Sequence, residues 1–265
     1  MSSLPTSRFR VGVAVQRSRR IQSSTRILCA LLALGASAGV LAQAPPPPAP
    51  APAPASPPSG MKDLGGGRYQ VGAIVVDRNA RQFAVPGRVL HIDDAPLEYI
   101  ATSPGGMKAY ETLLELDTTG TEFNLACILV GLDNSRTRRP DFQFDRRSPE
   151  GPRVDLGLRW QASGQAVQRS LQDVLAIRTP PGRPAEPTPP EEWVYTGSFS
   201  RDDSGQYAAD VTGTLIGFVH DPASIIEHRT GLGIGAYGSV QGNREVLPPI
   251  GSAIELVVTV PPAAD

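Results

Sequence analysis

Apolar and polar residues alternate along several short stretches after residue 61. The clearest is Val154–Trp160 (VDLGLRW), in which every second residue is apolar, and Gln165–Arg169 is its predicted hairpin partner. Glu255–Val260 (ELVVTV) is rich in β-branched residues and lies between two pairs of prolines. A period of two and β-branched residues are typical of β-strands. The pattern therefore predicts a largely β fold.

A second hairpin is predicted around the turn sequence SPGG at 103–106. Leu97–Thr102 (LEYIAT) and Tyr110–Leu116 (YETLLEL) flank this turn and have strand-like composition. The stretch Gln82–Ile92 is interrupted by Pro86 and Gly87, which indicates a bend or bulge. Further strands are expected in Tyr69–Asp77, Trp193–Ser200, Tyr207–Val211 and Thr214–His220.

One segment has the period of an amphipathic helix, Asp117–Gly131 (DTTGTEFNLACILVG). Thr119 or Thr121 can cap its start, and Glu122 lies in the first turn. Its apolar residues Phe123, Ala126, Cys127 and Val130 share one face, and Gly131 can end the helix. The predicted fold class is therefore α+β, mainly antiparallel β, with one principal helix near residues 119–131 and long Gly/Pro-rich loops.

The N-terminal 42 residues have the composition of a secretory signal peptide. Six arginines and no acidic residue precede the apolar run Ile27–Ala42, which ends in small residues. Cleavage is predicted near Ala42, with an uncleaved anchor as the alternative. The expected location is the periplasm or the outside of the cell, with no membrane span after cleavage.

The next segment, 43–60, contains nine prolines in QAPPPPAPAPAPASPPSG and is predicted to be a disordered Pro/Ala-rich linker. Residues 61–265 are expected to form a single domain. A second proline cluster, between Pro180 and Pro190, is interpreted as a long loop within that domain.

Composition narrows the function classes. The chain contains 25 basic and 26 acidic residues, and removal of the leader's six arginines leaves a formal charge of −7. This acidic balance argues against a nucleic-acid partner. Five arginines between Arg136 and Arg147 could bind an anionic polymer, but interleaved aspartates favour a solvated loop.

After cleavage Cys127 is the one remaining cysteine, which excludes an internal disulfide, a cysteine zinc site and an iron–sulfur cluster.

Three stretches resemble the YdjY-domain family. They are PLEYIATSPGGMKAYETLLELDTTGTEFNLACILVGL (96–132), WVYTGSFS followed by YAADVTGTLIGFVHDPASII (193–200 and 207–226), and LPPIGSAIELVVTV (247–260). The family consists largely of exported bacterial proteins with no established activity. The resemblance therefore implies an exported domain and adds little chemistry.

The strongest candidate site combines Glu98, Lys108 and Glu111. Lys108 is one of two lysines in a chain with 23 arginines, and the predicted hairpin would bring the two glutamates together near it. Two carboxylates and an ammonium could bind a ligand or cation, or transfer protons. The alternative is a cross-strand ion pair with a structural role.

Other motifs give weaker evidence for a functional site. His91, His220 and His228, with Asp221 and Glu227, could supply metal ligands, but their spacing matches no metal motif, and no metal site is predicted. GIGAYG (233–238) has the letters of a dinucleotide-binding loop but no helix pattern after it. GASAG (35–39) matches a nucleophile elbow but lies inside the leader. No cofactor is expected.

These observations favour an exported, non-catalytic binding or envelope-interaction module. Its partner would be a cell-envelope protein or a small ligand. The alternative is an enzyme or cation-dependent site built on Glu98, Lys108 and Glu111.

Overall fold

The structure, a computed structural model, describes residues 60–178, 186–187 and 192–262. The expected signal peptide, nearly all of the linker and most of the second proline cluster lie outside the described residues. Within the described part, no helix has both the length and the apolar composition needed to cross a membrane.

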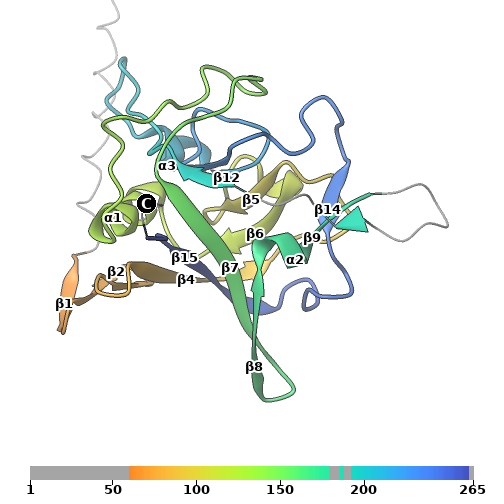
Figure 1. Cartoon of the computed structure of the whole chain (residues 1–265), viewed down its shortest axis with the longest axis horizontal. Helices are drawn as coiled ribbons and strands as arrows, with labels where there is room; N and C mark the ends of the chain where they lie inside the picture. Colours follow the sequence, from red (N-terminus) through yellow and green to blue (C-terminus); the bar gives the residue numbers. More distant parts are fainter. Residues whose placement is uncertain (1–59, 179–185, 188–191, 263–265) are drawn as a thin grey trace, which may run out of the picture. The chain divides into compact units, whose positions relative to one another are not determined.

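Eight strands form a closed barrel (Figure 1). Strand β4 pairs with β15 on one side and with β6 on the other, which closes the ring. In ring order the strands are β4 (Gln82–Val89), β15 (Ala253–Thr259), β7 (Arg153–Ala162), β11 (Trp193–Tyr195), β13 (Ile226–His228), β12 (Thr214–Gly217), β5 (Tyr99–Thr102) and β6 (Thr112–Leu116). The β5–β6 and β12–β13 pairs are parallel and the other six are antiparallel, so the barrel is mixed.

The predicted α+β class, mainly antiparallel with one principal helix near 119–131, is therefore wrong. Three short α-helices accompany the barrel in the described residues: α1 (Gly120–Leu129), α2 (Leu171–Val174) and α3 (Ala208–Thr212). The segment Tyr207–Val211, expected as a strand, instead lies largely in α3, which Gly213 ends with a positive φ of 75°. The predicted hairpin around 103–106 is also wrong, because β5 and β6 run parallel and are joined by a short 3₁₀ helix, η1 (Ala109–Glu111).

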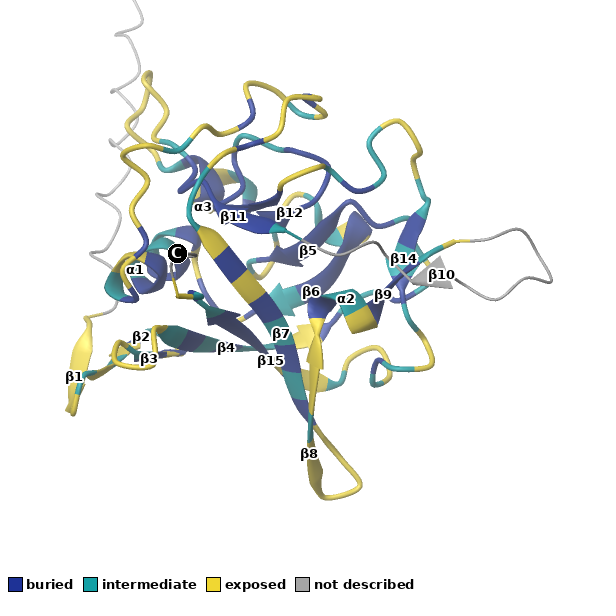
Figure 2. Ribbon diagram, viewed as in Figure 1, coloured by how far each residue is buried: buried dark blue, intermediate teal, exposed yellow. Residues whose placement is uncertain are grey.

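Further strands extend from the barrel. A meander of β1 (Lys62–Gly65), β2 (Arg68–Val71) and β3 (Ile74–Asp77) continues from β4. The predicted partner of β7 is confirmed as β8 (Gln165–Ser170), and the hairpin projects away from the barrel with an exposed outer strand (Figures 1 and 2). A separate small sheet contains β10 (Glu186–Pro187), β9 (Leu175–Ile177) and β14 (Val240–Gly242).

Pro86 and Gly87, where the sequence indicated a bend or bulge, lie where β4 changes partners, and the pairing of β4 with β15 continues through them without a register shift. Residues 82–84 of β4 pair with β3, whereas 87–89 pair with β6, and β15 follows the strand along both halves. A Cβ atom on Gly87 would lie 2.2 Å from the carbonyl oxygen of Glu115 and 2.9 Å from Cα of Leu116. The absence of a side chain at residue 87 lets β4 and β6 approach closely enough to close the barrel.

Helix α1 covers the end of the barrel at which β5, β6 and β15 finish. Thr119, one of the two residues that the sequence indicated as caps, caps the helix through a capping box with Glu122. On its inner face Phe123 meets Phe83 of β4 edge to face, with ring centroids 5.3 Å apart. This end of the barrel is closed by apolar side chains.

Cys127 lies on the buried face of α1, and burial raises the pKa of its thiol well above the ordinary value. Since the thiolate is the reactive species, we expect iodoacetamide to leave Cys127 unmodified in the native protein and to alkylate it fully in denaturant. Mass spectrometry of the peptide that contains Cys127 checks this without interference from Cys29. Rapid modification under native conditions would contradict the buried position.

Candidate functional site

The barrel end opposite α1 gathers the predicted site residues. Strands β5 and β6 both begin at this end, where β12 and β13 finish. The parallel register pairs Tyr99 with Thr112, so the preceding residues Glu98 and Glu111 are neighbours, and the Glu98 N–H donates to the Glu111 carbonyl at 2.9 Å. The expected proximity of the two glutamates is therefore present, although it arises from parallel strands.

Lys108 completes this group, and its ammonium donates to Oε1 of Glu111 at 2.8 Å. Its Nζ lies 5.9 Å from the centre of the Tyr99 ring and 5.7 Å from that of Tyr110. The side chain of Glu111 is nearly fully buried, whereas that of Lys108 is partly exposed. Partial burial opposes the charge on Lys108, but the hydrogen bond to Glu111, the negative charge of Glu111 and the interaction with Tyr110 together raise the pKa of the lysine.

Glu98 is the member with the most altered acidity. Burial raises its pKa to about 7, and the negative charges of Glu111 and Asp221 add to the shift, while Lys108 opposes it. Glu98 is only 5% exposed. Near neutral pH this carboxyl group can therefore both hold and release a proton.

The sequence analysis did not group Tyr99 or Asp221 with this site, and it named Asp221 only as a candidate metal ligand beside the histidines. The Tyr99 hydroxyl donates to Oδ2 of Asp221 at 2.9 Å and accepts from Nε2 of Gln143 at 3.0 Å. Burial, followed by the charge of Asp221, raises the pKa of Tyr99. No local pattern could have found Asp221, which reaches the site through the pairing of β12 with β5.

Behind this group lies Glu227, which is completely buried. Its Oε1 accepts from the backbone N–H of Asp221 at 2.9 Å, and burial raises its pKa well above the ordinary value. A Cβ atom on Gly217 would lie 2.8 Å from the same Oε1, so the glycine leaves the space that the carboxyl group occupies.

The histidines are structural neighbours of these acids. Nε2 of His220 lies 2.9 Å from the carbonyl oxygen of His228, and both side chains are buried. Burial lowers the pKa of His228 to about 4, and the electrostatic effect of the neighbouring His220 adds to the shift. His91 instead pairs with Asp94 at 2.9 Å. Among the described residues, no three His, Cys, Asp or Glu side chains form a group that could hold a metal ion.

Two of the loop motifs have structural explanations. In 233–238 the three glycines of the motif adopt positive φ angles in a run of turns, and no helix follows. In the arginine-rich loop Arg147 pairs with Asp141 and Asp145, and Arg138 pairs with Glu150. These ion pairs neutralise part of the positive charge that an anionic polymer would need.

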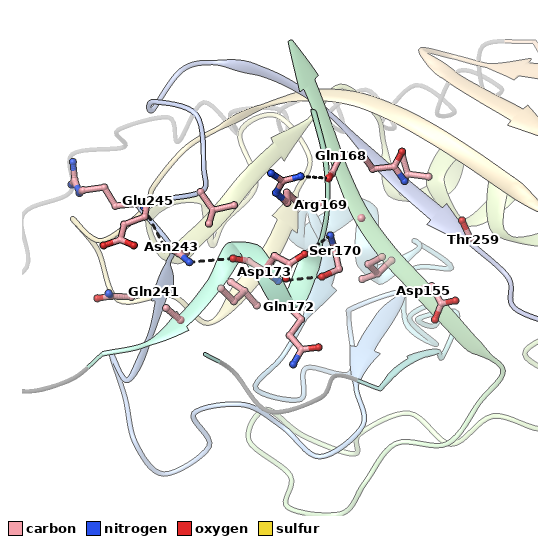
Figure 3. A pocket seen from close by; sticks show the side chains of 17 residues that line it. Asp155, Gln168, Arg169, Ser170, Gln172, Asp173, Gln241, Asn243, Glu245 and Thr259 are labelled. Carbon is pink, nitrogen blue, oxygen red and sulfur yellow. Dashed lines mark hydrogen bonds between the residues drawn. The ribbon is translucent and has the colours of Figure 1, made fainter. Parts of the chain in front are cut away.

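A large cleft lies on the outer face of the barrel, away from the predicted site. Its volume is about 1150 Å³, and it lies between the β7–β8 hairpin and the strands β9 and β14 (Figure 3). Four carboxamide side chains contribute to its wall: Gln168, Gln172, Gln241 and Asn243. Charged side chains come from Asp155, Arg169, Asp173, Arg244 and Glu245, and apolar side chains from Leu175, Ala176 and Val257 form part of its surface.

Several cleft side chains are held in place by hydrogen bonds (Figure 3). Asn243 donates to the carbonyl oxygen of Asp173 at 3.2 Å and accepts from the N–H of Glu245 at 3.1 Å. Ser170 and Asp173 form a capping box at the start of α2. The bond from Asn243 to Asp173 ties the residue that follows β14 to helix α2.

The extent of the barrel can be compared with known protein families. The YdjY domain matches residues 74–259, from the first residue of β3 to the last residue of β15. The chain belongs to the YdjY-domain family. The match spans every strand of the closed barrel, so the YdjY domain of this chain is the barrel with its attached elements. No curated protein and no solved structure matches the chain.

Both the barrel end that holds Glu98, Lys108 and Glu111 and the outer cleft lie within the matched YdjY domain. The sequence resemblance to this family is thus confirmed. The cleft could not be found from the sequence, because its walls come from strands and turns between residues 155 and 259 that are brought together only by the fold.

Proposed function

We propose that this YdjY domain is an exported, non-catalytic binding module of the cell envelope, and that the outer cleft holds its ligand. The observation that carries the proposal is the cleft itself: about 1150 Å³ lined by carboxamide and charged side chains on a rigid barrel wall. Large concave sites with convergent polar groups are the usual places for ligands. Export is supported by the basic and apolar N-terminal residues 1–42.

A cleft-blocking variant tests this function. Gln241 lies on β14 in the cleft wall, so Gln241→Trp fills part of the space, whereas Gln165→Trp places the same ring at the exposed hairpin tip outside the cleft. In a thermal-shift screen of the full chain against sugars, peptides and amino acids, we expect ligands that raise the melting temperature of the wild type and the Gln165→Trp variant. The Gln241→Trp variant should lose that shift. Equal shifts in both variants would place binding elsewhere.

A second candidate function is acid–base chemistry at Glu98, Lys108 and Glu111. The specific observation in its favour is that Glu98, with a pKa of about 7, lies in a group with a neighbouring ammonium and a second carboxyl. A panel of chromogenic ester, amide and glycoside substrates tests it with wild type and Glu98→Gln. Turnover that follows a group with a pKa near 7 and disappears in Glu98→Gln would support it, and equal rates in both proteins would exclude a role for Glu98.

A further inference from the structure

We infer that the cleft's ligand is an uncharged, hydroxyl-rich chain, a short neutral oligosaccharide, recognised by the carboxamides on its two walls and the aliphatic side chains between them. This inference rests on the proposed binding function of the cleft. It adds the chemical class of the ligand.

The charges in the cleft do not select an ion. Arg244 is bound to Asp93 through both its Nε and an Nη atom, and Asp173 accepts from the N–H of Ser170. Within the described residues this leaves Arg169 without a carboxylate partner and Asp155 and Glu245 without a basic one. An anionic ligand would meet these two carboxylates and that of Asp173, whose charge the Ser170 N–H does not cancel, and a cationic ligand would meet the Arg169 guanidinium. A neutral ligand avoids an unfavourable charge contact of either sign.

The carboxamides suit hydroxyl groups. Each presents an acceptor oxygen and two N–H donors in one plane, and a sugar hydroxyl both donates and accepts. Gln168 lies on β8 and Gln241 on β14, on opposite walls of the cleft (Figure 3). Their side chains make no hydrogen bond among the described residues, so both are available to a ligand that spans the cleft.

Part of the cleft surface is aliphatic. Leu175, Ala176 and Val257 are buried side chains that contribute to its lining. The C–H face of a sugar ring can cover such a surface, while its hydroxyl groups reach the polar walls. The cleft volume of about 1150 Å³ is at the upper end of ligand pockets and suits a ligand of several linked rings.

The alternative ligand is an extended peptide that would pair with the edge of β8 as an added strand. The two-residue turn at Ser163 and Gly164 makes Ala162 and Gln165 a hydrogen-bonded pair, so backbone groups of Ala166, Gln168 and Ser170 face outward. The carbonyl of Gln168 already accepts from the Arg169 guanidinium, and the N–H of Ser170 donates to Asp173. These bonds occupy the edge where an added strand would pair.

Isothermal titration of the full chain with neutral tetrasaccharides of glucose and of N-acetylglucosamine tests the inference. Acidic oligogalacturonate and uncharged tetrapeptides are the comparison probes. We expect a neutral tetrasaccharide to bind, and Gln168→Ala and Gln241→Ala each to weaken it by roughly fivefold, the effect of losing one or two hydrogen bonds. Gln165→Ala, outside the cleft, is the matched control and should bind as the wild type does.

The possible failures are distinct. If peptide or oligogalacturonate binds more tightly than the neutral sugars and Gln241→Trp abolishes that binding, the ligand class is wrong and the binding cleft stands. If a sugar binds equally to wild type and Gln241→Trp, the site is wrong. If none of the probes binds and none shifts the melting temperature, both the ligand class and the binding function of the cleft are overturned.

Discussion

Gly87→Ala is expected to lower the free energy of unfolding by roughly 3 kcal/mol, the upper range for overpacking a well-packed position. The added methyl group would lie 2.2 Å from the Glu115 carbonyl oxygen, and this neighbour is backbone that cannot rotate away. Relief of the contact requires β4 and β6 to separate where they close the barrel. For a domain of this size the melting temperature should fall by about 10 °C.

The matched control is Gly60→Ala, because a Cβ atom at residue 60 meets nothing within 4 Å. We expect this variant to unfold within about 0.5 kcal/mol of the wild type. Urea unfolding of the three proteins, followed by tryptophan fluorescence, provides the comparison. If both alanine variants lost equal stability, the close approach of β4 and β6 would not be the reason that residue 87 must be glycine.

The second large effect is a pH dependence caused by Glu98. Its pKa is about 7 in the folded protein against 4.5 in the unfolded chain. Below pH 4.5 the group is protonated in both states and its contribution to stability is fully present. As the pH rises toward 7 only the unfolded chain releases the proton, so stability is lost across this window, by at most about 3 kcal/mol.

Glu98→Gln replaces the titrating carboxyl group with an amide that binds no proton in this pH range. We therefore expect the variant to gain stability relative to the wild type as the pH rises from 4.5 to 7, with a constant difference above 7. Glu245→Gln removes one exposed negative charge and controls for the change in net charge. Urea unfolding at a series of pH values measures the difference, which cancels the contribution of Glu227. A difference that did not change with pH would show that Glu98 is not held protonated by the fold.

Local patterns in the sequence predicted local structure well. The alternation in 154–160, with its expected partner 165–169, predicted the β7–β8 hairpin. Thr119, one of the two expected caps, begins α1. These elements are determined by neighbours in the chain, through side-chain period, turn conformation and cap hydrogen bonds. Such signals are contained within a few residues.

The closed barrel depends on contacts that no short pattern contains. Its closure pairs residues 87–89 with 114–116, and the same strand with 253–259. The composition of 97–102 and 110–116 fits parallel and antiparallel strands equally, so the turn sequence between them led to the wrong pairing. In Tyr207–Val211 the mixture of alanine, valine and tyrosine suits a short strand, but Gly213 with its positive φ ends a helix there.

The candidate site divides in the same way. Glu98, Lys108 and Glu111 could be grouped because they lie within 14 residues of one another. Asp221 and Tyr99 meet only through the pairing of β12 with β5, and the cleft residues through a wider set of strands. The raised pKa of Glu98 could not be predicted from the sequence either, because it comes first from the burial of this side chain in the folded protein.

The position of β15 sets an order of assembly for the chain. It is the last strand, and it lies between β4 and β7; the side chains of Gln82 and Thr259, 177 residues apart, are hydrogen-bonded across one of its edges. A chain delivered from its N-terminus can therefore form the β7–β8 hairpin and α1 early, but it cannot complete the ring until residues 253–259 are available. Such long-range closure slows folding and leaves the edges of β4 and β7 unpaired for that time.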